Sequence, residues 1–136
     1  MAINEIQDEI IEEFSFFDDW MERYEYIIDL GKSLPLIDAK YKDEAHLIKG
    51  CQSQVWLHAD NDDNKIDFTA DSDAVITKGI IALLIRVLSG QSAKAIAAAN
   101  LYFIDKIGLK EHLSPTRSNG LVSMVKQMKL YGVALA

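Results

Sequence analysis

The sequence contains little cysteine, proline or glycine, and these scarcities narrow its class. Among 136 residues there are one cysteine, two prolines and seven glycines. A single cysteine cannot form a disulfide within the chain, so nothing suits an oxidising compartment and we expect a cytoplasmic protein. So few prolines and glycines leave no room for a long structureless linker, and the length predicts one domain over residues 1–136.

Basic residues are also scarce. Fourteen Lys and Arg stand against 21 Asp and Glu, which gives a net charge of −7. A nucleic-acid binder needs a basic footprint, and adhesion to anionic lipid needs one too. The most apolar stretch, residues 74–88, is interrupted by Lys78 and Arg86 and is too short to span a bilayer. No positive segment followed by an apolar run marks a signal peptide at Met1. We therefore expect neither nucleic acid nor a membrane as a partner.

Two helices are predicted in the first part of the chain. Apolar residues recur at three- and four-residue spacing over residues 3–14, with Asn4 as the predicted cap. Asp18 or Asp19 should start the second helix. Gly31 stands where a left-handed residue would end it, and Pro35 prevents its continuation.

The period then changes to two. Val55, Leu57 and Ala59 alternate with polar residues, and a second alternating run follows the turn at residues 61–64. This pattern predicts a hairpin with one buried face. A third strand over residues 45–48 would make it a small antiparallel meander, with residues 49–52 as the intervening turn.

Helices return in the second half. Asp73 is predicted to cap a buried central helix over residues 74–88, of which Lys78, Ala82 and Arg86 form the only wet edge. Ser92 should cap a short alanine-rich helix, and Ser114-Pro115 should begin the last one. The predicted fold class is α+β, with a small antiparallel meander packed against several helices.

Cys51 is the main candidate for chemistry. A free cysteine is more often a small buried hydrophobe than a reactive group. This one follows Gly50 in a polar stretch that predicts a tight turn, which can present a thiol to a partner. Backbone amides of the turn, with Lys49 and His46 nearby, would favour the thiolate.

Four blocks of the sequence together resemble the SufE family. They are Gly50-Cys51-Gln52-Ser53-Gln54-Val55-Trp56-Leu57, residues 24–32 with Leu34-Pro35, residues 71–74 with Lys78-Gly79, and residues 112–121. The resemblance covers nearly the whole chain in order. It departs at His46, where many relatives have asparagine.

The resemblance implies a function. Cys51 would accept sulfur from the persulfide of a pyridoxal-phosphate cysteine desulfurase of the SufS type, stimulate that enzyme, and pass the sulfur to a SufBCD-type scaffold for iron–sulfur clusters. It would be a transfer partner without stand-alone turnover, holding no cofactor or metal, with a fold like that of IscU-type scaffolds. The implied partner contacts are Gly50, Gln52, Ser53, Gln54, Asp73 and Arg117.

Elementary chemistry agrees with this implication. Persulfide transfer is a thiolate attack on a sulfur–sulfur bond, and it requires one accessible thiolate. Without a second cysteine, sulfur on Cys51 must leave to a thiol of another molecule. Because a persulfide in bulk water is lost to stray reductants and oxidants, we expect the turn to tuck Cys51 against an apolar pocket and to flip outward on docking.

Other functions fit the sequence less well. The spacing of His46, His58 and His112 does not predict convergence with Cys51 on a metal ion, and a cluster scaffold needs more soft ligands. For a Cys-His hydrolase, the sequence shows neither an oxyanion motif nor a residue that would orient the histidine. The remaining alternative is a non-catalytic adaptor that regulates a desulfurase and in which Cys51 is structural.

Overall fold

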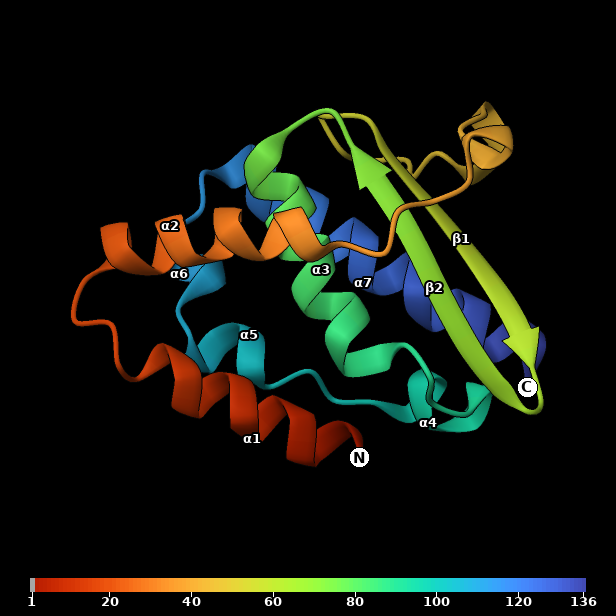
Figure 1. The fold of residues 1–136 in the computed structure, drawn as a ribbon, viewed down its shortest axis with the longest axis horizontal. Helices are drawn as coiled ribbons and strands as arrows, with labels where there is room; N and C mark the ends of the chain where they lie inside the picture. Colours follow the sequence, from red (N-terminus) through yellow and green to blue (C-terminus); the bar gives the residue numbers. More distant parts are fainter. Residues whose placement is uncertain (1) are drawn as a thin grey trace.

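The computed structural model describes residues 2–136 and contains helices around a single two-stranded sheet (Figure 1). In chain order its elements are α1 (Ile3–Phe14), α2 (Trp20–Leu30), the 3-10 helices η1 (Gly31–Ser33), η2 (Ala39–Tyr41) and η3 (Glu44–His46), β1 (Val55–Asp62), β2 (Lys65–Ser72), α3 (Val75–Leu88), α4 (Ala93–Ala98), α5 (Phe103–Lys106), α6 (Leu109–His112) and α7 (Pro115–Leu135). The predicted α+β class is confirmed.

Helix α3 forms the centre of the core. It runs between the α1–α2 pair and the sheet, with α7 behind it (Figure 1). Because α3 is apolar almost all round, it can be covered on nearly every side, and Ile81 and Leu84 are completely buried. Lys78, Ala82 and Arg86 stay partly exposed, as the sequence predicts.

The crossing of α2 and α3 depends on two glycines. A Cβ on Gly79 would overlap the carbonyl oxygen of Ile27, and one on Gly31 would lie 2.9 Å from the backbone nitrogen of Gly79. The prediction that Gly31 is a left-handed helix end is wrong, because its φ is −61° and the chain continues into η1. Gly31 serves close backbone approach instead.

The strands pair antiparallel from Val55 opposite Ser72 to Asp62 opposite Lys65. Asp63 and Asn64 alone make the turn, both with positive φ, which suits the right-handed twist of a two-residue hairpin. The predicted inner face is confirmed, since Val55, Leu57, Ile66, Phe68 and Ala70 are buried. This face packs against helices α3 and α7.

The predicted third strand is wrong. Asp43 accepts a hydrogen bond from the backbone N–H of His46 (3.0 Å), and this cap winds residues 44–46 into the 3-10 helix η3. Only Leu47 then pairs with Trp56, as an isolated antiparallel bridge. In place of the meander there is a hairpin, to which Leu36, Leu47 and Gln91 are each joined by an isolated bridge.

Most predicted helix starts are confirmed. Asp19, Ser92 and Ser114 each accept a hydrogen bond from the backbone N–H three residues further on. Asn4 is not a cap, because α1 already begins at Ile3. Among residues 2–136 we find no helix that combines the length and apolar character needed to cross a membrane.

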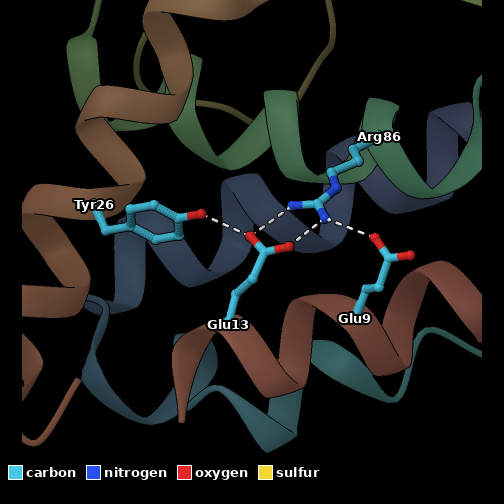
Figure 2. A network of polar contacts seen from close by, with 4 residues as sticks. All are labelled: Glu9, Glu13, Tyr26 and Arg86. Carbon is cyan, nitrogen blue, oxygen red and sulfur yellow. Dashed lines mark hydrogen bonds and ion pairs between the residues drawn. The ribbon is translucent and has the colours of Figure 1, made fainter. Parts of the chain in front are cut away.

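A polar cluster joins helices α1, α2 and α3 (Figure 2). From α3, Arg86 donates to Glu13 of α1 through both terminal nitrogens and to Glu9 at 3.2 Å. The Tyr26 hydroxyl of α2 donates to Glu13 at 2.6 Å. The hydrogen bond from Arg86 holds the pKa of Glu13 below its ordinary value, whereas burial and the Glu13 carboxylate raise the pKa of Tyr26 to about 12. We call these four residues the Arg86 cluster.

Candidate functional site

The cysteine lies in a loop, residues 49–54, which we call the cysteine loop. Gly50 has a φ of +90°, a conformation that glycine adopts without strain. A Cβ there would also lie 2.5 Å from the Oγ of Ser123, so the loop is seated directly against α7. The tight turn predicted at Gly50 is confirmed, and only glycine suits it.

Both ends of the cysteine loop are fixed by hydrogen bonds. At the base, the N–H of Ile48 donates to the carbonyl of Val55 at 2.8 Å. The N–H of Gln54 donates to the Asp73 carboxylate at 3.0 Å, and the N–H of Asp73 donates to the carbonyl of Gln54 at 3.3 Å. The prediction that Asp73 caps α3 is wrong, because Ala74 is the cap residue and the Asp73 carboxylate holds the loop instead.

The Cys51 side chain is half-buried beside a small pocket. Its thiol donates to the carbonyl of Gly120 on α7, with Sγ 3.6 Å from the oxygen. The pocket has a volume of about 100 Å³, below the roughly 300 Å³ at which small-molecule sites begin. It is lined by Cys51, Gln52 and Ser53 of the loop, Thr77 and Ile80 of α3, and Thr116, Arg117, Gly120 and Met124 of α7. The pocket fits a few atoms rather than a metabolite.

Glycine at position 120 leaves space next to the sulfur. A Cβ there would lie 3.5 Å from Sγ, at ordinary contact distance. Because Gly120 has no Cβ, only its backbone lies beside Sγ. An atom attached to Sγ therefore has room to lie along the pocket.

The resting site favours the thiol over the thiolate. Burial raises the pKa of Cys51, because removing a charge from water is unfavourable. The expectation that Lys49 and His46 favour the thiolate is wrong for this arrangement. Lys49 is exposed and pairs with Glu44 at 3.8 Å, and His46 bonds elsewhere. Low reactivity follows for the free protein, since the thiolate is the nucleophile.

Arg117 is exposed at the edge of the pocket. Its Nη1 donates to the hydroxyl of Tyr24 at 3.3 Å, which joins the first turn of α7 to α2. Of the residues predicted to contact a partner, Arg117 thus shares the pocket with Gln52 and Ser53, whereas Gln54 and Asp73 bond to each other at the base of the loop.

Sequence reasoning missed the pocket walls. The sequence pattern places Thr77 and Ile80 only within the buried central helix over residues 74–88 and does not connect Met124 with Cys51. Two features of the sequence could have indicated them: Thr77 places a hydroxyl group in an otherwise apolar run, and Gly120 is a glycine inside the last helix. Neither shows by itself which loop it meets.

The other conspicuous residues lie apart from the thiol. Trp56 is half-buried on the outer face of the sheet, with the Lys42 amine 5.6 Å from its ring. His112 stacks on Trp20 at a centroid distance of 4.7 Å. Within residues 2–136, no group of three or more His, Cys, Asp or Glu side chains is arranged to hold a metal ion.

Comparison with known proteins identifies the family. Residues 8–131 match the family model described as "SufE: Fe-S metabolism associated domain". The chain belongs to the SufE family, and this confirms the resemblance seen in the sequence. Its class is thereby associated with iron–sulfur metabolism.

Relatives agree with this assignment, and a solved structure shares the fold. The chain is 46% identical over 127 residues to an uncharacterized SufE-like protein of Rhizobium etli, covering 90% of this chain and 86% of that one. It is 37% identical to an uncharacterized SufE-like protein of Synechocystis, covering 92% of this chain and 79% of that one. With SufE-like protein 1, chloroplastic/mitochondrial, of Arabidopsis thaliana it shares 38% identity, over 89% of this chain and 33% of that one. A hypothetical protein of Thermus thermophilus has the same fold, with a TM-score of 0.78, 20% identity and coverage of 96% and 95%.

Proposed function

We propose that this protein carries sulfur as a persulfide on Cys51. It takes the sulfur from a pyridoxal-phosphate cysteine desulfurase of the SufS type, stimulates that enzyme, and delivers the sulfur to a SufBCD-type scaffold of iron–sulfur cluster assembly. The observation that supports this most is the placement of the only thiol on a loop that turns at Gly50, with free space beside Sγ. A transfer partner of this kind has no turnover of its own.

The transfer needs no oxidant or reductant. The Cys51 thiolate attacks the outer sulfur of the donor's persulfide, so a new sulfur–sulfur bond forms at Sγ while the donor's own sulfur–sulfur bond breaks. The donor cysteine leaves as a thiolate and takes up a proton. In delivery, a thiolate of the recipient attacks the outer sulfur, and Cys51 returns to the thiol.

The pocket gives the carrier a protected resting state. The raised pKa of Cys51 keeps the unloaded protein in its less reactive thiol form, which limits oxidation of the free thiol. Binding to the desulfurase would turn the cysteine loop outward about Gly50 and bring Sγ into a more polar setting. The trigger for reactivity is then the partner.

The partner would contact the pocket edge, where Gln52, Ser53 and Arg117 lie together. The net charge of −7 favours a basic docking patch on the desulfurase, since complementary charge speeds encounter. A free thiol as the working group fits the reducing cytoplasm.

Mass spectrometry after incubation with the desulfurase and L-cysteine tests the proposal. We expect the intact protein to gain one sulfur atom, located on the peptide that contains Cys51. Cys51→Ser should gain none, and His112→Gln should load like the wild type because His112 lies apart from the thiol. Absence of added sulfur on the wild type would contradict the proposal.

Stimulation of the desulfurase separates carrier from adaptor. The half-buried thiol with its raised pKa is also what a structural cysteine would show. A carrier loses all stimulation in Cys51→Ala, whereas an adaptor keeps most of it. We expect complete loss.

A further inference from the structure

Two histidines meet on the outer face of the sheet, away from the groups that line the thiol pocket. His46 ends η3 and His58 lies in β1, and their rings approach with Nε2 of His46 3.1 Å from Nδ1 of His58. Each ring bonds a carboxylate on its other side. Nδ1 of His46 lies 2.7 Å from Asp43, and Nε2 of His58 lies 2.9 Å from Asp60. We call His46 and His58 the histidine pair.

Counting hydrogens shows that the histidine pair is incomplete. A carboxylate only accepts, so the nitrogens that face Asp43 and Asp60 carry the ring hydrogens. In two neutral rings the inner nitrogens then face each other with two lone pairs and no hydrogen between them. A positively charged species, either a proton or a metal cation, must lie there for the contact to be favourable.

We propose that the histidine pair binds a divalent transition-metal ion such as Zn²⁺ through Nε2 of His46 and Nδ1 of His58, with water in the remaining positions. Two nitrogens at about 2.0–2.1 Å from zinc lie about 2.8–3.4 Å apart for angles between 90° and 109°. The observed 3.1 Å falls inside this range. The separation of the two nitrogens therefore suits neighbouring ligands of one ion.

The surroundings match those of metal-binding histidines. Such a histidine usually donates its second ring hydrogen to a carboxylate, which fixes the tautomer and strengthens the ligand, and both rings here do so. Tyr41 stacks on His58 at 3.8 Å and tilts against His46 at 5.0 Å, so both rings are held in place. The two side chains are only 19% and 15% exposed. The Lys40 amine, 5.0 Å from the Tyr41 ring, is a nearby positive charge.

A metal here would bridge the two segments that enter and leave the cysteine loop. These segments are otherwise joined by the Leu47–Trp56 bridge and the hydrogen bond from Ile48 to Val55. The histidine pair shares no residue with the proposed sulfur transfer, and metal binding is measured independently of it.

Calorimetric titration of Zn²⁺ into tag-free protein tests the site. All proteins should carry Cys51→Ser, because a thiolate would itself bind zinc. We expect one ion per chain, and loss of that binding in His46→Asn and in His58→Gln. Asp43→Asn and Asp60→Asn should each weaken binding about 10- to 100-fold, which is typical of carboxylates behind a ligand. His112→Gln is the matched control and should bind like its parent.

Two results would overturn the site. One is failure of the parent protein to take up zinc while a shared imidazole proton is visible by NMR, which would mean that a proton alone fills the gap. The other is equal binding by the parent and by folded His46→Asn, as checked by circular dichroism, which would place the ion elsewhere.

Discussion

The two ends of helix α3 carry polar groups in opposite conditions. At its C-terminal end, Arg86 is bonded by two carboxylates, and Tyr26 completes the cluster (Figure 2). Near its N-terminal end, Thr77 lines the pocket where the Cys51 thiol has one long hydrogen bond. The Arg86 cluster holds three helices together, whereas the pocket at the other end of α3 leaves space unfilled beside the thiol.

The contrast suggests that stability and reactivity are separable in this fold. A change at the α2–α3 crossing should damage both, a change in the Arg86 cluster should lower stability alone, and a change at Gly120 should affect the thiol alone. Three substitutions, in order of decreasing effect, test this division.

Gly79→Ala should have the largest effect. The new Cβ would overlap the carbonyl oxygen of Ile27, so α2 and α3 must move apart. We expect the free energy of unfolding to fall by about 3 kcal/mol or more in urea denaturation, and alkylation of Cys51 to become faster. Ala82→Ser on the wet edge of α3 is the control and should change stability by less than about 0.5 kcal/mol. A variant as stable as the wild type would show that the crossing is not tight.

Arg86→Met should have an intermediate effect that depends on pH. We expect a loss of about 1 kcal/mol at pH 7, because water screens these partly exposed groups, with an unchanged rate of Cys51 alkylation. Lys94→Met, an exposed lysine of α4, is the control for loss of one positive charge.

The sign of this pH dependence follows from Glu13. Its folded-state pKa is lowered from an ordinary value of 4.5, so its contribution is fully present above that pH and disappears as the pH falls through the lower folded value. The difference in stability between wild type and Arg86→Met should therefore shrink as the pH is lowered below about 4.5. A difference that stays constant down to pH 2 in denaturation curves would contradict a role for the ionised carboxylate.

Gly120→Ala should have the smallest effect on stability. Alanine in a helix interior is favoured over glycine by up to about 1 kcal/mol, and its Cβ would only touch Sγ at 3.5 Å. We expect equal or slightly higher stability, with Cys51 alkylated several-fold more slowly and loaded with less sulfur. Val122→Ala, exposed on the same helix, should leave the thiol unchanged. Unaltered thiol reactivity in Gly120→Ala would mean that the pocket does not control access.

The sequence predicted those parts of the fold that local patterns determine. The helix over residues 74–88 was predicted correctly because it is apolar almost all round, and the hairpin because its alternation places one set of side chains in the core. Gly31 and Asp73 were assigned wrong roles because their positions are set by tertiary neighbours, the backbone of Gly79 and the N–H of Gln54. The prediction of a third strand was wrong because the hydrogen bond from the N–H of His46 to Asp43 favours a 3-10 helix there.

The candidate site divides in the same way. Gly50 and Cys51 could be found from the residues themselves, since a glycine before a lone cysteine in a polar stretch indicates a turn. The pocket walls could not, because Thr77 and Gly120 reach the thiol only through the packing of α3 and α7. The meeting of His46 with His58 likewise depends on how η3 lies along β1.

The position of Gly120 also has a consequence during protein synthesis. Cys51 and the residue that accepts its hydrogen bond are 69 positions apart in the chain. At about 5–20 residues per second, translation takes roughly 3–14 seconds to pass from one to the other. In the nascent chain the Cys51 thiol is therefore exposed to cellular oxidants and electrophiles before α7 has been synthesised. It becomes half-buried only when that helix packs against the cysteine loop.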